Sequence, residues 1–274
     1  MRCFAGWAFA TFCLCLGACA LHPATGRRDI STALDSQFWA SVEKVDVIYV
    51  GERHDNPADH QYEKELVREL LKRGVRFAIG WEMFDETQQT AIDAWASHSI
   101  SLKEMLAKTG FQQHWGVYSA VYERILRTAR DARVPNIALN APPDLVRKIA
   151  RGTPLSAGEQ AMLPIGFASN EQAYNNFLTM MGDHPGMTKA DQRRFFAAQN
   201  IWDQTMASRV LEFKRNNPGV KLVVLTGRGH VSGGYGIPFY VKQKSNLRQM
   251  VLLPSLGSGL NNQHLASQMS IVQT

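Results

Sequence analysis

Short, strongly apolar segments recur along this chain, each ends near glycine or a polar residue, and helical patterns separate them. Near-continuous apolar segments of this length are typical of strands that are buried on both faces of a sheet. Their alternation with helices predicts an α/β fold, with a mostly parallel sheet flanked by helices. Five strands are expected, at residues 45–50, 76–81, 136–139, 221–225 and 248–253.

Amphipathic helices are expected between the first strands, and the middle of the chain then changes character. The first helix is well defined, because Asn56 is a suitable N-cap and Pro57 suits the first helical position. Only helical patterns occur from residue 156 to residue 216, so an all-helical insert, a natural lid or ligand-binding subdomain, precedes the fourth strand. The expected helices cover residues 57–72, 86–96, 118–132, 142–150, 156–163, 170–181 and 189–215.

The N-terminus has the pattern of a bacterial lipoprotein signal peptide. An apolar run at 4–16 follows Arg2 and is too short to span a bilayer comfortably. The sequence Leu-Gly-Ala-Cys at 16–19 resembles the lipobox, which predicts cleavage of a signal peptide at 1–18 and lipidation of Cys19. An ordinary secretory signal with an incidental cysteine is the alternative. All four cysteines lie in this region, so the mature domain is expected to fold without a disulfide bond.

Three further parts are expected after the signal peptide: a lipidated tether at 19–37, an α/β domain at 38–254 and a polar, disordered tail at 255–274. Acyl chains such as palmitate on Cys19 would anchor the chain to a lipid bilayer. Ala20 rather than aspartate follows the cysteine. By resemblance to other lipoproteins, we therefore expect outer-membrane sorting, with the domain on the periplasmic face. The net charge of +6 is scattered along the chain, which argues against a nucleic-acid partner.

Polar residues follow four of the expected strands. Gly-Glu-Arg-His-Asp-Asn occupies residues 51–56, Trp-Glu occupies 81–82, Asn140 ends the third strand, and Gly-Arg-Gly-His occupies 227–230. Because ligands bind at the carboxyl ends of strands in an open parallel sheet, these segments should converge on one cleft. Two histidines and two glutamates in one cleft suit metal binding or acid–base chemistry. These candidate site residues are Glu52, His54, Glu82 and His230.

The same segments carry a family resemblance. Together with Ala-Gln at 198–199, Trp-Asp at 202–203 and Met-Ala at 206–207, they resemble the ChaN-type lipoproteins of the Tiki/TraB superfamily. The resemblance implies haem binding linked to iron uptake at the outer membrane. It also implies a homodimer that can enclose haem at the subunit interface, and an outer-membrane haem receptor as a partner. In the protease members of the superfamily, the residues that match His54, Glu82 and His230 resemble a divalent-metal hydrolytic centre.

Haem binding requires a flat apolar slot and an axial ligand to the iron, which tyrosinate or histidine can supply. Tyr174, Phe177 and Met181 share one face of an expected helix, and His184 lies in the loop beyond it. Tyr174 and His184 are therefore the candidate axial ligands. Ordinary core packing is the alternative interpretation of this face.

A divalent-metal hydrolase of peptide or ester bonds is the alternative function. Mn²⁺, Co²⁺ or Zn²⁺ held by the two strand-end histidines and a carboxylate would activate a bound water. Glu52 or Glu82 would act as the ligand or as the general base. Arg53 and Arg228 are expected to bind the cofactor or, in a hydrolase, to stabilise an oxyanion. Hydrogen bonds that only support the fold are the other interpretation, so enzyme activity stays open. His60 is expected to lie in solvent, and the loop at 232–236 to turn the chain.

Overall fold

The computed structural model describes residues 36–115, 120–168, 170–182, 187–254 and 269–270. The predicted signal peptide, the lipidation site at Cys19 and most of the predicted tether lie outside these residues. The candidate ligand His184 and most of the predicted tail lie outside them as well. Within the described part of the chain, no helix is both long enough and apolar enough to cross a membrane.

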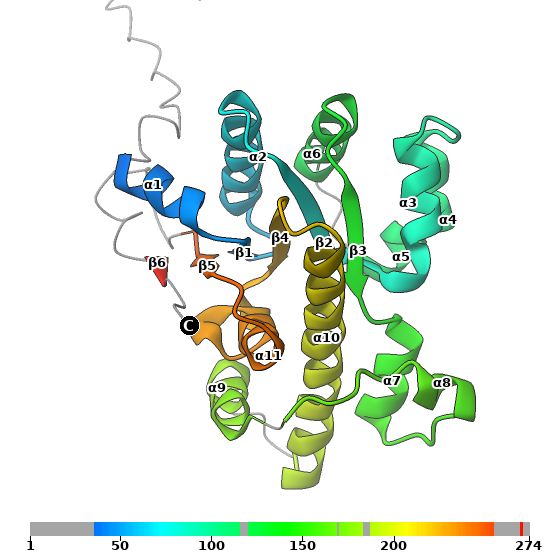
Figure 1. The fold of residues 1–274 in the computed structure, drawn as a ribbon. Coiled ribbons are helices and arrows are strands. Elements are labelled where there is room, and N and C mark those ends of the chain that lie inside the picture. Colours follow the sequence, from blue (N-terminus) through cyan, green and yellow to red (C-terminus); the bar gives the residue numbers. More distant parts are fainter. Residues whose placement is uncertain (1–35, 116–119, 169, 183–186, 255–268, 271–274) are drawn as a thin grey trace, which may run out of the picture.

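A sheet of five parallel strands forms the centre of the molecule (Figure 1). The strands are β1 (Val47–Glu52), β2 (Phe77–Asp85), β3 (Asn136–Asn140), β4 (Lys221–Gly227) and β5 (Gln249–Leu252). Their spatial order is β3-β2-β4-β1-β5, so β4 separates the first two strands of the sequence. A sixth, two-residue strand, β6 (Met269–Ser270), pairs antiparallel with β5. The predicted α/β fold class is confirmed.

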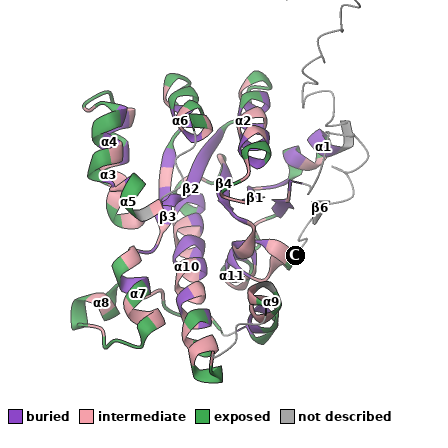
Figure 2. Ribbon diagram, turned by 180° about the vertical axis from the view of Figure 1, so that it is seen from behind, coloured by how far each residue is buried: buried purple, intermediate pink, exposed green. Residues whose placement is uncertain are grey.

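One face of the sheet is covered by the helices of the first half of the chain. These are α1 (Ser36–Lys44), α2 (Pro57–Lys72), α3 (Gln89–Ala96), α4 (Leu102–Lys108), α5 (Phe111–Trp115) and α6 (Ala120–Asp131). Their buried side chains form one large core with Ile48 and Val50 of β1 and with Ile79 and Trp81 of β2. Figure 2 shows the result: the sheet is buried, whereas the outer faces of these helices are exposed.

The opposite face is covered by two helices from the second half of the chain, α10 (Lys189–Asn216) and α11 (Ile237–Lys244). They form a second core with Val47 and Tyr49, the residues of β1 that alternate with those of the first core. This alternation follows from the two-residue period of a strand, which points successive side chains to opposite faces. Every β1 residue is therefore buried, as its continuous apolar sequence predicts.

The segment between β3 and β4 is helical, which confirms the predicted insert. It contains α7 (Pro143–Arg151), α8 (Ala157–Ala161), α9 (Glu171–Met181) and α10. The second half of α10 packs directly on the sheet through Met206 and Val210, which are fully buried. This helix is thus part of the main core as well as of the insert.

Candidate functional site

The carboxyl ends of the central strands bring His54 and Glu82 together around Gly227. Glu82 lies within β2, and its Oε2 accepts hydrogen bonds of 2.6 Å from the Gly227 amide and of 2.6 Å from the Thr226 hydroxyl. The absent side chain of Gly227 makes room for His54, because a Cβ atom there would lie 2.6 Å from His54 Nε2. Glycine at this strand end therefore permits the close approach of the two side chains.

His230 follows β4 and is held between two carboxylates. Its Nδ1 lies 2.5 Å from Asp203 Oδ1, and its Nε2 lies 3.2 Å from Glu82 Oε1. Burial lowers the pKa of His230, but the charges of Glu82 and Asp203 outweigh it and raise the pKa well above its usual value. For Glu82 the two effects have the opposite signs. Burial raises its pKa, but the nearby histidines, His230 above all, lower the pKa to about 2. A buried imidazolium and a buried carboxylate thus stabilise each other.

Glu52, at the end of β1, is the centre of a second group of polar side chains. Its Oε1 contacts His54 Nδ1 at 2.7 Å and accepts a short hydrogen bond from the Tyr122 hydroxyl. Burial lowers the pKa of His54, but the hydrogen bond to Glu52 and the charges of Glu82 and Glu52 raise it overall. The His54 ring packs edge-on against Trp115, with the ring centroids 4.6 Å apart. His54 therefore links the two groups.

The expectation that His60 is solvated is wrong. His60 is 3% exposed, and its Nε2 lies 3.0 Å from the Tyr122 hydroxyl and 3.3 Å from Glu52 Oε2. It lies on the face of α2 that also carries Glu63 and Val67, at helical spacings of three and seven residues. That face packs against the sheet, so His60 belongs to the polar group around Glu52.

Glu63 adds a buried carboxyl group that no sequence motif predicts. Both of its side-chain oxygens and Oε2 of Glu52 are buried without a hydrogen-bond partner among the described residues. Burial, together with the negative charge of Glu52, raises the pKa of Glu63 well above its usual value. A protonated Glu63 carries no charge to repel Glu52 and can donate a hydrogen bond.

The arginines predicted to bind a cofactor or an oxyanion contact the chain itself. Arg53 forms a bidentate pair with Asp59, through contacts of 2.9 Å and 2.8 Å. Arg228 donates to the Pro254 carbonyl at 3.0 Å and lies 3.8 Å from Asp59 Oδ2. Asn56 caps α2, as predicted, by accepting from the Ala58 and Asp59 amides. Asp59 therefore holds both arginines beside the start of α2.

Tyr174 lies elsewhere, in an aromatic cluster between α9 and α10. Its ring is 8% exposed and packs on Phe196, with the ring centroids 5.1 Å apart, and Phe177 packs on Phe196 at 5.6 Å. The Arg193 guanidinium lies 3.6 Å from the centre of the Tyr174 ring. Tyr235, in the loop after His230, packs against the same cluster. Among the described residues, the ring contacts of Tyr174 are thus with this cluster and not with the strand-end side chains.

The divalent-metal alternative receives no support from the geometry. Among the described residues, no group of three or more histidine, cysteine, aspartate or glutamate side chains is arranged to hold a metal ion. The candidate ligands contact one another instead: His54 Nδ1 faces Glu52, and both ring nitrogens of His230 face carboxylates.

Sequence reasoning missed several members of this site. Asp203 and Gln199 lie in motifs that carry the family resemblance, yet their spacing gives no indication that both contact His230. Tyr122 comes from α6, which has an ordinary amphipathic sequence. For His60 and Glu63, the one sequence signal of burial is their helical spacing to the apolar residue Val67.

Comparison with known proteins relates the chain to haem-binding proteins. A family model described as haem-binding uptake, Tiki superfamily, ChaN matches residues 38–241. The structure resembles ChaN of Campylobacter jejuni, which is described with cofacial haem binding. The sequence identity is 20%, 81% of this chain and 87% of that chain are covered, and the TM-score is 0.62.

A second solved structure with a similar fold is the open conformation of an erythromycin esterase EreC mutant. It is 14% identical, with 81% of this chain and 75% of that chain covered and a TM-score of 0.50. No curated protein matches the sequence significantly. At these identities, the structural likenesses establish the fold alone.

Proposed function

The chain belongs to the ChaN family of haem-binding uptake proteins in the Tiki superfamily, and from this premise we propose a membrane-anchored lipoprotein that binds haem for iron or haem uptake. The observation that carries the proposal is the family match, which spans most of the α/β domain, at residues 38–241. The lipobox-like sequence at 16–19 supports an anchor on Cys19. Its location would be the outer membrane, on the periplasmic face.

We assign the haem to the aromatic cluster of α9 and α10, which carries the candidate ligand Tyr174. Tyr174, Phe177 and Phe196 form the cluster, and the neighbouring Phe195 is 44% exposed. Bound haem supplies a ferric iron, for which a tyrosine oxygen is a suitable axial ligand. Tyr174 would hold the iron, while Arg193 fixes the orientation of the ring. His184 remains the second candidate ligand.

We expect haemin to bind to residues 20–274, which contain every described helix and strand, with a saturable Soret change near one haem per chain. Tyr174→Phe removes the ligand oxygen but keeps the ring, so haemin should bind at least about tenfold more weakly and lose its tyrosinate charge-transfer bands. Tyr62→Phe is the matched control, because Tyr62 is buried in the other core. Light scattering of the loaded protein tests the homodimer that the family resemblance implies.

The outcomes of the titration separate two questions. An unchanged spectrum of Tyr174→Phe would remove Tyr174 as the ligand and direct the same measurement to His184→Ala. A wild-type titration that never saturates at micromolar haemin would overturn haem binding itself.

If Cys19 carries the anchor, replacing its sulfur atom should change where the protein is located. Cys19→Ser removes the sulfur that receives the lipid, so the protein should no longer be processed at residue 19 or labelled by radioactive palmitate. Immunoblots of outer-membrane fractions and palmitate labelling measure the two effects. Cys15→Ser is the matched control, since Cys15 precedes the expected cleavage site. Equal labelling of the two variants would contradict the anchor.

A further inference from the structure

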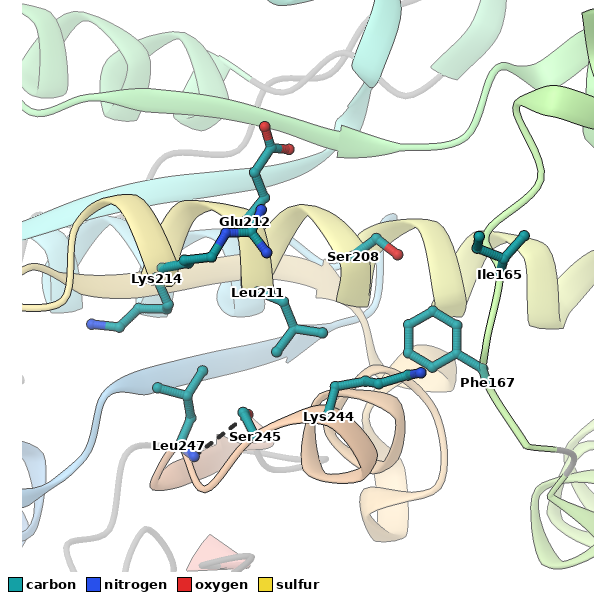
Figure 3. A pocket seen from close by; sticks show the side chains of 10 residues that line it. Ile165, Phe167, Ser208, Leu211, Glu212, Lys214, Lys244, Ser245 and Leu247 are labelled. Carbon is teal, nitrogen blue, oxygen red and sulfur yellow. Dashed lines mark hydrogen bonds between the residues drawn. The ribbon is translucent and has the colours of Figure 1, made fainter.

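A groove of about 600 Å³ lies between α10 and the end of α11, on the face of the sheet opposite α2 (Figure 3). Its size falls within the range of about 300–1,000 Å³ that is usual for small-molecule sites. Figure 3 shows Leu211 of α10 pointing toward Leu247 and Ser245 in the turn after α11, with Phe167 at the other end. None of the strand-end residues or the aromatic residues around Tyr174 lines this groove.

One wall of the groove is a short apolar connection between α8 and α9. Ile165 in this connection is 86% exposed, and Met162 nearby is 38% exposed. The connection is fixed in place, because the Ala168 amide donates to Gln243 Oε1 at 2.9 Å and Phe167 packs on Tyr240 with ring centroids 5.3 Å apart. A fixed wall with an exposed isoleucine presents apolar surface that a ligand can cover.

The available charge at the groove is positive. The Lys244 ammonium lies 5.3 Å from the centre of the Phe167 ring, and Arg215 is exposed. Neither forms an ion pair within the described part of the chain. Glu212, the acidic residue that lines the groove, is paired with Arg209 at 2.5 Å. Lys214 points its ammonium to the carbonyls of Pro218 and Val220, so it is already hydrogen-bonded.

Apolar walls with a cation at one end complement an elongated apolar molecule that carries one negative charge. We propose that this groove binds a long-chain fatty acid, with the acyl chain along Leu211 and Leu247 and the carboxylate at Lys244. The lining contains no histidine, tyrosine, methionine or cysteine. The groove therefore lacks an axial ligand for haem iron, and its proposed ligand is independent of the proposed haem site.

Displacement of a fluorescent fatty acid by palmitate, on haem-free protein of residues 20–274, tests this site. We expect saturable, competitive binding of one probe per chain. Lys244→Gln removes the cation and should weaken palmitate binding about tenfold, whereas Lys242→Gln, an exposed lysine of the same helix that does not line the groove, should leave it unchanged. Hexadecanol, which has the chain without the charge, should compete more weakly than palmitate.

A second variant tests the apolar part of the groove without changing its charge. Ser208→Phe places a ring in the groove, so probe binding should be lost while the circular dichroism spectrum and the haemin titration stay those of the wild type. Binding that does not saturate, equal effects of the two lysine substitutions, or binding to anionic vesicles without binding of monomeric palmitate would each overturn the proposal.

Discussion

Glu82→Gln is expected to lower the free energy of unfolding by about 3–5 kcal/mol, the usual effect of removing one partner from a buried ion pair. Glutamine has nearly the shape of glutamate and can still accept the hydrogen bonds of Gly227 and Thr226. It cannot neutralise His230, which then keeps only Asp203 as a charged partner. Urea-induced unfolding, followed by circular dichroism, measures the loss.

The stabilisation by the Glu82–His230 pair depends on pH. Because the folded pKa of Glu82 is about 2, below its ordinary value of 4.5, its contribution to stability is present above pH 4.5 and is lost as the pH falls toward 2. The folded pKa of His230 is raised, so its contribution is complete below pH 6.5 and is lost as the pH rises through the folded pKa. The wild type should therefore exceed Glu82→Gln in stability most between pH 4.5 and 6.5.

Asp144→Asn is the matched control for a lost carboxylate. Asp144 pairs with Arg147, but the two side chains are 83% and 51% exposed. Such a surface pair contributes about 0–1 kcal/mol. An equal loss in both variants, or a difference between Glu82→Gln and the wild type that does not change with pH, would contradict the buried pair.

Gly236→Ala is expected to destabilise the fold by about 3 kcal/mol, at the upper end of the overpacking range. An added Cβ would overlap the carbonyl oxygen of His230 and lie 2.8 Å from its carbonyl carbon and 3.1 Å from Asp203 Oδ2. A flexible side chain could relieve such an overlap by rotating, but backbone atoms cannot. The loop that carries His230 must therefore shift, and thermal unfolding should occur at a clearly lower temperature.

Gly219→Ala is the matched control for this substitution. No atom lies within 4 Å of a Cβ added at Gly219, and its φ angle is not in the left-handed region. Alanine there should leave the unfolding temperature unchanged or raise it slightly, because it restricts the unfolded chain. A Gly236→Ala variant as stable as Gly219→Ala would mean that the His230 loop is not held as tightly as described.

The strands and the long helices could be predicted from the sequence, because buried strands appear as apolar runs and helices as amphipathic patterns. The helix at 57–72 has the predicted bounds, and Asn56 and Pro57 set its start. β2 was predicted to end before Glu82 but continues to Asp85. The charge of Glu82 favours a strand end, whereas in the fold Glu82 is a buried partner of His230. α11 was not predicted, since its eight residues are too few to show a helical period.

Part of the candidate site could be predicted from the order of strands and polar residues in the sequence. Parallel strands must meet at one edge, so the rule for their carboxyl ends was enough to expect Glu52, His54, Glu82 and His230 near one another. The structure places them there, in two groups joined by His54. Their partners Asp203 and Tyr122 come from helices far away in sequence, and only the packing of those helices on the sheet determines the contacts.

The central position of β4 has a consequence for the order in which the molecule assembles. β1 and β2 are made first but do not pair with each other, because β4 lies between them. The middle of the sheet therefore cannot close until Gly227 has left the ribosome. Long-range parallel pairing of this kind forms slowly compared with helices. Until then, the inner edges of β1 and β2 stay unpaired, so the sheet of a nascent chain of this fold stays incomplete through most of its synthesis.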